Sequence, residues 1–506
     1  MPINFIVNDP LALASVPMRN KEPLPDRQTS QAGFTFVKSS LAALFSPGTA
    51  DFLFWQSREA ALTAIQVWEA LNGPLKQWGP QTQNPAKLDL LPDAGDDLNA
   101  FYDRSSLSFF HHTMGGDTFF SGASTDVVAH ESGHAFLDAL RPELFGTNIT
   151  EHGAFHEAFG DCTALLTAFS DQGTRQALLA DSPDLGSINF VESLSEQLSS
   201  AVKLAFGANN PAAEPRHAFN SFKFQLPTTL PRSGPPATLT SEIHSFGRVF
   251  LGCFYDMVRK IFENAATRDE ASLSSAAQAA GKLLIAGAQQ AALSPRFFQS
   301  VGRAIVLADQ TLNGGTNHQA ISDAFSGHGI LLGTMSALMP KASIAGPAPQ
   351  LGAKTTALSL APETLKDVKK RIQASAGSKL SLQKITLGDR EVVQATHYRE
   401  VPLDQDSKKL KGVVAYAPEP VLVGGVGKFA AVFNMLPDAA TTEDEVHAFV
   451  ETLLANDNIA FESVKSGAAK ALLSTDSNTN FSKDHTHVIA RIKGKKVLKR
   501  IRYLCR

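Results

Sequence analysis

The stretch DVVAHESGHAFLDAL, residues 126–140, has two histidines four positions apart and a glutamate directly after the first. Its pattern favours a helix. Residues four apart lie one above the other on a helix, so His130 and His134 would present two imidazoles to one point. Zinc accepts such nitrogen ligands at about 2.0–2.1 Å in a tetrahedral site. The stretch therefore predicts half of a zinc site.

Glu131 has a different role in this pattern. It is rotated by about one hundred degrees around the helix from His130, because a helix has 3.6 residues per turn. That position is poor for a third ligand but suits a general base beside a metal-bound water. H-E-x-x-H on a helix is a metalloprotease signature. Taken alone, the motif leaves open an ordinary pair of histidines without a metal.

The next predicted helix, EHGAFHEAFGDCTALL (residues 151–166), provides the missing carboxylates. Glu157 can complete a three-ligand zinc site and leave the fourth position open. Asp161 lies one turn later on the same face and can orient a ligating histidine. Two carboxylates facing two histidines would be hard to bury without a metal. For His156, beside Glu157, we expect a solvated or supporting position.

Composition limits the class of protein. The chain has 506 residues, a formal net charge of -3 and three cysteines. The length suits two or three domains, and the charge gives no reason to expect a nucleic-acid partner. Such sparse cysteines predict free thiols, two of them buried in helices, rather than a disulfide framework.

The N-terminus lacks a basic start followed by an apolar core, and no run of 18 apolar residues occurs. We therefore expect no membrane span and a cytoplasmic location. Secretion by another route is the alternative.

We expect an α+β fold in several parts. Residues 1–125 mix strand patterns with one helix and are interpreted as a β-rich N-terminal lobe of the catalytic domain. Residues 126–332 are interpreted as a helical zinc-binding lobe, with helices at 126–140, 152–170, 244–266, 270–292, 296–311 and 318–327. Residues 333–361 are rich in Ala, Gly, Pro and Ser, which is typical of a linker. Residues 362–506 predict a small α+β C-terminal module of unknown role.

Five separated segments resemble, in order, the thermolysin-like gluzincins (thermolysin/fungalysin type), which are zinc metallopeptidases. They are DLNAFYD (97–103), similar to the substrate-binding edge strand; DVVAHESGH (126–134), similar to the zinc helix; GAFHEAFGD (153–161), similar to the third-ligand helix; EIHSFGRVF (242–250), similar to the segment with a second histidine; and AISDAFSGHGI (320–330), similar to the closing helix. The resemblance covers about residues 30–332. It implies a two-lobe catalytic domain with the zinc helix at the base of the cleft.

The resemblance also implies residue roles. Zn(2+) would be bound by His130, His134 and Glu157. Glu131 would be the general base that takes a proton from the metal-activated water, and Asp161 would orient His130.

Four further residues would act on the substrate in this resemblance. His244 would be a second catalytic residue that donates a hydrogen bond to the oxyanion. Asn99 and Ala100 would bind the substrate main chain. Arg216 would lie near the substrate carbonyl, with a surface arginine as the alternative.

Two family features are missing. The segment RPELFGTNITEHGAFH (141–156) has no tyrosine to assist the oxyanion. The family aspartate shortly before the second histidine is also absent, and Glu242 is a possible substitute. We expect a zinc metalloendopeptidase that acts on a peptide or protein substrate. The alternatives are a zinc-binding protein of the same fold with little peptidase activity, acting as a binding module, and a zinc hydrolase of a small non-peptide substrate.

The end of the chain is basic, with the sequence RIKGKKVLKRIRYLCR from Arg491 onward. We expect a β-hairpin with a solvated lysine face, typical of an edge strand. An electrostatic contact with an anionic partner is the alternative. If the enzyme is kept in check, the C-terminal module is one candidate for doing so.

Overall fold

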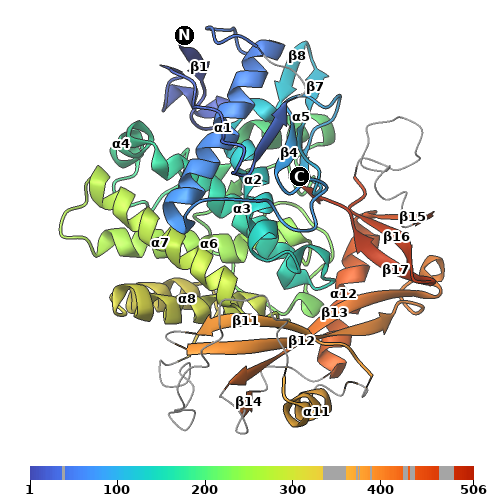
Figure 1. The fold of residues 1–506 in the computed structure, drawn as a ribbon. Helices are drawn as coiled ribbons and strands as arrows, with labels where there is room; N and C mark the ends of the chain where they lie inside the picture. Colours follow the sequence, from blue (N-terminus) through green and yellow to red (C-terminus); the bar gives the residue numbers. More distant parts are fainter. Residues whose placement is uncertain are drawn as a thin grey trace.

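The structure is a computed structural model that describes the whole chain except residues 37–39, 334–359, 372–373, 375–376, 388–389, 425–430, 434–438, 466–483 and 506. It is an α+β fold with an N-terminal mixed sheet, a central helical region and a C-terminal curled mixed sheet (Figure 1). The α+β class predicted from the sequence is confirmed.

The N-terminal sheet has the strand order β18-β5-β6-β4-β3 among the described residues. Its strands are β3 (Gly33–Phe36), β4 (Lys87–Leu91), β5 (Ala100–Tyr102), β6 (Ser106–Phe109) and β18 (Tyr503–Leu504). β4 pairs parallel with β3 and β6, whereas β5 pairs antiparallel with β6 and β18. The last strand of the chain is therefore the outermost strand of this sheet, beside β5.

Smaller elements complete the N-terminal region. β1 (Ile3–Phe5) pairs with β2 (Arg19–Lys21), and the helix α1 (Ala50–Asn72) runs behind them. β7 (His111–Met114) and β8 (Asp117–Phe120) pair antiparallel and turn at Gly115 and Gly116. Both glycines have positive φ, 64° and 95°, a conformation that glycine adopts without steric cost.

The central region contains each of the six helices predicted there. They are α2 (Thr125–Leu140), α3 (Thr150–Ser170), α6 (Ile243–Glu263), α7 (Glu270–Gln290), α8 (Phe297–Asn313) and α9 (His318–Gly327). Two helices were not predicted, α4 (Gln172–Asp181) and α5 (Glu196–Phe206). α2, α3 and α6 pack side by side in the core, and α1 lies against α2. Cys162 and Cys253 are buried free thiols on α3 and α6, as expected.

The C-terminal residues form a sheet with the order β11-β12-β13-β17-β16-β15, with β14 paired to β13. Its strands are β11 (Ser381–Leu387), β12 (Arg390–Pro402), β13 (Val413–Gly424), β14 (Ala431–Phe433), β15 (Ile459–Lys465), β16 (His487–Ile492) and β17 (Lys495–Arg500). Its helices are α11 (Pro362–Arg371) and α12 (Ala439–Ala455).

The predicted basic hairpin is β16 and β17, which turn at Lys493 and Gly494. Its expected position at a sheet edge is wrong, because β17 also pairs with β13 and β16 also pairs with β15. Most of the predicted linker, 333–361, lies outside the described residues.

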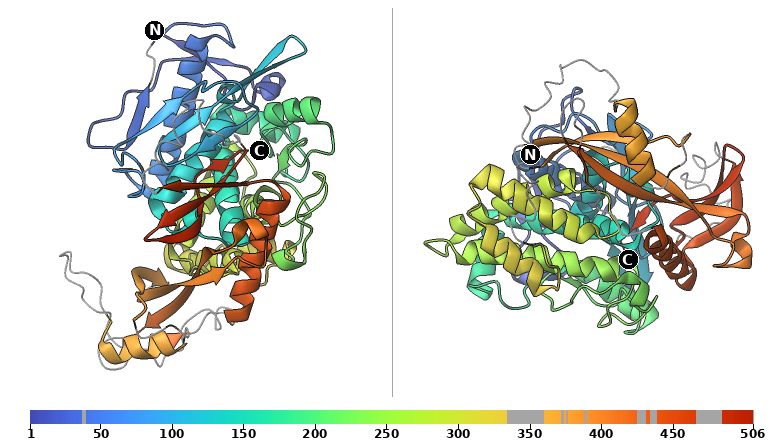
Figure 2. Two further views of the ribbon diagram at one scale, coloured as in Figure 1. Left: turned by 90° about the vertical axis from the view of Figure 1, so that its right-hand side faces the viewer. Right: turned by 90° about the horizontal axis from the view of Figure 1, so that it is seen from below.

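The C-terminal residues are closely attached to the rest of the molecule. Arg232 pairs with Glu451 at 2.7 Å, Arg296 pairs with Glu445, and the Ser241 and Thr452 hydroxyls lie 2.6 Å apart. Figures 1 and 2 place the C-terminal end near the middle of the molecule, and β18 pairs with β5 of the N-terminal sheet rather than with the C-terminal sheet that precedes it. None of the helices in the described part of the chain has the length and apolar character needed to span a membrane.

Asp138 fixes β5 to α2. It is fully buried on α2, and its Oδ2 accepts hydrogen bonds from the Tyr102 hydroxyl at 2.8 Å and from Arg104 Nε at 2.9 Å. Asp138→Ala would leave the Tyr102 hydroxyl and the Arg104 guanidinium without this partner. We expect it to lower the free energy of unfolding by about 3 kcal/mol, as for other broken buried ion pairs. Urea unfolding of the metal-free protein measures the loss.

Asp323→Ala is the matched control, because Asp323 accepts its hydrogen bond from Gln319 at an exposed site on α9. It should change stability by less than about 0.5 kcal/mol. Equal losses in the two variants would contradict the role given to Asp138.

Candidate metal centre

The centre forms where α2 and α3 pack closely at Gly133 and Gly160. A Cβ added at Gly133 would lie 2.8 Å from Gly160 Cα, and one added at Gly160 would lie 2.8 Å from Cε1 of His130. Both distances are too short for a real Cβ. The two glycines therefore allow the helices to approach closely enough for His130 and His134 to face Glu157.

The three predicted ligands come together. His130 Nε2 lies 3.4 Å from Glu157 Oε2, and His134 Nε2 lies 3.5 Å from the same oxygen. Zinc bonds of about 2.0–2.1 Å in a tetrahedron place neighbouring ligand atoms about 3.3 Å apart. His130, His134 and Glu157 thus form a buried cluster that can hold a metal ion.

The polar atoms of this cluster also fit a metal. All three side chains are at most 1% exposed. Within the described residues, Nε2 of His130, Nε2 of His134 and both carboxylate oxygens of Glu157 have no hydrogen-bond partner. Buried polar atoms without partners are costly. Two imidazole nitrogens and one carboxylate are a typical donor set for zinc, which would satisfy them.

Neighbouring side chains determine which ring nitrogen faces the centre. His130 Nδ1 lies 2.8 Å from Asp161 Oδ1, so it donates to Asp161 and leaves Nε2 for the metal. His134 Nδ1 lies 2.8 Å from His156 Nδ1. His156 is fully buried, so the solvated alternative for this residue is wrong. Asp161 has the position expected from the sequence, and its partner on the other side is Arg216, at 2.9 Å.

Glu131 directly follows the ligand His130 on α2 but makes no hydrogen bond to Asp161 or His156, the side chains that hold the two histidine ligands. It is fully buried on α2, and its two carboxylate oxygens have no hydrogen-bond partner among the described residues. Burial raises the pKa of Glu131 to about 8, with the charge of Glu157 adding to the effect and that of His130 opposing it. Burial also disfavours ionised Glu157, but the positive charges of His244 and His134 hold its pKa well below its usual value. The two glutamates therefore differ in proton affinity.

His244 reaches the centre from the first turn of α6. Glu242 caps this helix by accepting from the backbone N–H groups of His244 at 2.9 Å and Ser245 at 3.0 Å. The same carboxylate holds His244 Nδ1 at 2.9 Å. Glu242 thus occupies the orienting position proposed for it. His244 Nε2 lies 3.2 Å from Glu157 Oε2 and 2.6 Å from the carbonyl oxygen of Leu504.

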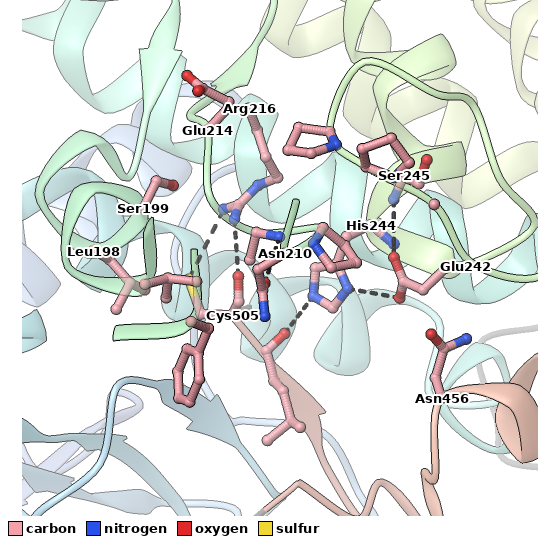
Figure 3. Close-up of a pocket in the computed structure, with 18 of the residues that line it drawn as sticks. Leu198, Ser199, Asn210, Glu214, Arg216, Glu242, His244, Ser245, Asn456 and Cys505 are labelled. Atoms are coloured by element: carbon pink, nitrogen blue, oxygen red, sulfur yellow. Dashed lines mark hydrogen bonds and ion pairs between the residues drawn. The ribbon is translucent and has the colours of Figure 1, made fainter. Parts of the chain in front are cut away.

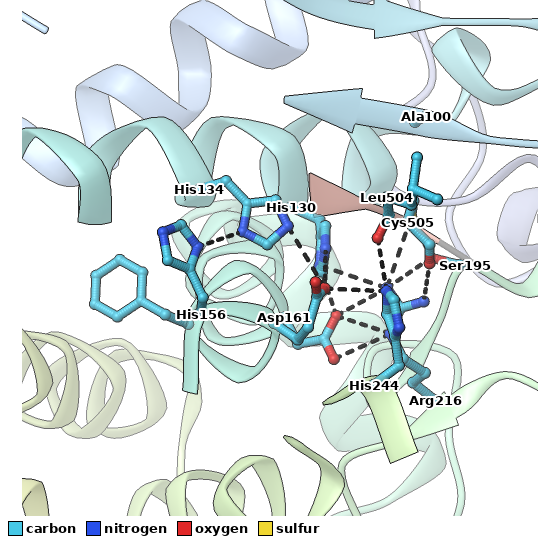
Figure 4. A network of polar contacts seen from close by, with 12 residues as sticks. Ala100, His130, His134, His156, Asp161, Ser195, Arg216, His244, Leu504 and Cys505 are labelled. Carbon is cyan, nitrogen blue, oxygen red and sulfur yellow. Dashed lines mark hydrogen bonds and ion pairs between the residues drawn. The ribbon is translucent and has the colours of Figure 1, made fainter. Parts of the chain in front are cut away.

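The last described residues of the chain lie in this site (Figure 4). Leu504 pairs with Phe101 of β5, and the N–H of Cys505 donates to the Ala100 carbonyl at 2.9 Å and to Asn99 Oδ1 at 3.2 Å. The Cys505 carbonyl accepts from Arg216 at 2.8 Å. Arg216 is on β10 (Arg216–His217) and is mostly buried, so the surface alternative for this residue is wrong.

The predicted substrate-binding residues therefore meet in one place. His244, Asn99, Ala100 and Arg216 all touch main-chain atoms of Leu504 or Cys505. A cavity of about 400 Å³ opens beside them (Figure 3). Its lining includes Leu198 and Val202 of α5 together with Arg216, His244 and Cys505.

Sequence reasoning missed Tyr503, Leu504 and Cys505. Tyr503 is fully buried, and its ring stacks on His156 at 4.0 Å and on His134 at 4.9 Å between centroids. No motif marks these residues, and nothing in their spacing connects them with His130. Only the general tendency of an exposed strand edge to pair with another strand could have suggested that β5 has a partner.

No protein-family model and no curated protein sequence matches this chain. The arrangement of the side chains supports a site at His130, His134 and Glu157 that could hold a metal ion.

Removing the third ligand should reduce metal binding. Glu157→Ala takes away one of three protein donors and should lower zinc affinity by at least about 100-fold. Asp161→Asn keeps every donor and should act more mildly, by about 10-fold, through the orientation of His130. Competition with a chromophoric zinc chelator measures both affinities.

Glu192→Gln is a suitable control, because Glu192 is a buried carboxylate bonded to His217 outside the centre. It should leave zinc affinity unchanged. Full zinc affinity in Glu157→Ala would mean that the third ligand is another residue.

Proposed function

We propose that this protein is a zinc-dependent peptidase that hydrolyses a peptide or protein substrate with an activated water. The observation that carries the proposal is the buried His130-His134-Glu157 cluster, with the unpaired carboxylate of Glu131 beside it. Its closest chemical analogy is the thermolysin-like family that the sequence motifs resemble.

The donor set is suited to Zn(2+), which when bound would polarise the scissile carbonyl and make water easier to deprotonate. Hydrolysis adds one water across the C–N bond. Glu131 would take the proton that the attacking water loses and pass it to the leaving amine. Glu131 is buried beside the ligands, and its oxygens have no hydrogen-bond partner among the described residues, so the carboxylate is free to accept this proton.

His244 would stabilise the oxygen of the scissile carbonyl as negative charge develops on it. Its Nε2 already lies 2.6 Å from a carbonyl oxygen, that of Leu504. Glu242 accepts the Nδ1 proton, so Nε2 donates to the carbonyl when the ring is doubly protonated. Burial opposes that charged form, but the negative charges of Glu157 and Glu242 raise the pKa of His244 to about 9. A hydrogen bond placed in advance needs no reorganisation during the reaction. Arg216 and Ala100 would hold the main chain on the far side of the bond.

A peptide substrate is supported by the contacts that the site makes with a peptide main chain. β5 offers an edge to which an extended strand can pair, a common mode of peptide recognition. A small non-peptide substrate would leave the Ala100 carbonyl without a partner and would not use the main-chain contact that Arg216 makes in addition to its ion pair with Asp161. A binding module with little activity would use the same contacts without turnover, and the assay separates these alternatives.

Glu131→Gln should abolish hydrolysis and leave zinc bound, because the amide cannot take up the proton while the three donors remain. The assay uses a mixture of internally quenched peptides with zinc-loaded protein, and zinc is measured on the same preparation. Since Leu504 and Cys505 lie in the site, it is run on the full chain and on a chain that ends at Arg502. Wild-type turnover in Glu131→Gln would contradict the mechanism. Bound peptide without any turnover in the unsubstituted protein would favour the binding module.

His244→Ala should lower kcat by about 100- to 1000-fold, the usual cost of losing one oxyanion donor. The comparison is made in the chain that ends at Arg502, so that loss of the His244–Leu504 contact does not affect the result. His217→Ala is the matched control, because His217 neighbours Arg216 but bonds to Glu192. An unchanged kcat in His244→Ala would exclude the role given to this histidine.

A further inference from the structure

The end of the chain lies in the proposed active site in the manner of an extended peptide. Tyr503 and Leu504 form β18, antiparallel to β5, in register with Tyr102 and Phe101. The ladder continues through the Cys505 N–H, which donates to the Ala100 carbonyl at 2.9 Å. Without β18, β5 would be the edge of its sheet. The chain therefore covers the edge that a peptide substrate would need.

The bond between Leu504 and Cys505 lies at the reacting position. The carbonyl oxygen before this bond is held by His244 at 2.6 Å, and the N–H after it is held by Ala100. The next carbonyl, that of Cys505, is held by Arg216 at 2.8 Å. These are main-chain contacts, so they reproduce what any peptide would make there.

The side chains of this segment close the centre to solvent. Tyr503 stacks on His134 and His156, and the Arg500 guanidinium lies 4.2 Å from the centroid of the Tyr503 ring. Tyr503 and Cys505 are fully buried. With them in place, the ligands and Glu131 are at most 1% exposed, so a second peptide cannot reach the centre.

The thiol of Cys505 lies near the centre but is not grouped with all three proposed ligands. Its Sγ lies within 4.8 Å of one ligand atom of His130 and one of Glu131. Among the described residues, the Cys505 thiol is grouped with His130 and Glu131, whereas His134 and Glu157 belong to the other group around His130. The main chain of Leu504 and Cys505, rather than the thiol, occupies the substrate position.

We propose that residues 503–505 are a built-in, substrate-like inhibitor that keeps the enzyme latent until this segment is displaced or removed. The proposal rests on the proposed peptidase function and adds its regulation. Its physical basis is intramolecular competition, since a segment tethered to the same chain competes at a high effective concentration with any free peptide. A segment seated in 99% of the molecules would lower the apparent activity about 100-fold.

Two substitutions at one position test the main-chain contacts in the full-length protein. Cys505→Pro removes the N–H that Ala100 and Asn99 accept, and a proline ring does not fit a paired strand. It should raise kcat/KM on quenched peptides about 100-fold. Cys505→Ser keeps the N–H and changes only the sulfur, so it should stay as inactive as the natural chain. If both variants were activated equally, the proposal that main-chain contacts hold residues 503–505 in the site would be wrong.

A binding measurement keeps the test independent of turnover and of the folding of any single variant. The probe is a fluorescein-labelled peptide with the sequence of residues 503–506, and Glu131→Gln is present in every protein so that the probe stays intact. Zinc content and the melting temperature check that each variant is folded. Anisotropy should rise with Cys505→Pro and with the chain that ends at Arg502, but not with the full chain or with Cys505→Ser.

The outcomes separate the two proposals. Equal turnover and equal probe binding in the full chain and in both released forms would overturn the built-in inhibitor and leave the peptidase intact. Probe binding only in the released forms, with no hydrolysis of any peptide by zinc-loaded protein, would support the covered site and overturn the peptidase. Failure of the probe to bind any folded form would overturn the inhibitor.

Discussion

The close contact of α2 and α3 is the constraint on which the rest of the site depends. Gly133 and Gly160 leave no room for a Cβ between the helices. The imidazoles of His130 and His134 therefore both lie within 3.5 Å of the Glu157 carboxylate in a buried position. Such a set of polar atoms is costly to bury without partners. A metal that takes nitrogen and oxygen donors is the chemical species that satisfies it.

Further hydrogen bonds and ion pairs connect the three clustered side chains to the main chain of Leu504 and Cys505. Asp161 holds His130 on one side and Arg216 on the other. Arg216 in turn holds the Cys505 carbonyl. Glu242 both begins α6 and orients His244, which holds the Leu504 carbonyl. Asp161 therefore connects His130 of the candidate metal cluster to the Arg216 side chain that contacts the Cys505 carbonyl.

The last described residues of the chain pair with the edge of the N-terminal sheet. An open strand edge is a place where other strands pair, and proteins usually cover it. Here β18 covers β5, although β18 follows directly from the C-terminal sheet. The C-terminal residues are therefore attached to the region that holds the centre through main-chain pairing as well as through the ion pairs of α12 with Arg232 and Arg296.

The sequence by itself determined the local parts of this protein. Helical periodicity placed the six central helices, and the spacing of His130 and His134 identified two members of the cluster, because residues one turn apart share a helix face. Glu157 was a candidate carboxylate on the next helix, and the family resemblance implied its role. The helices α4 and α5 were not predicted. Only the tertiary structure decided that the basic hairpin lies inside its sheet and that Leu504 and Cys505 lie against His244 and Arg216. The reason is that strand pairing uses main-chain groups, which every residue carries, so partners hundreds of residues apart leave no mark in the side chains.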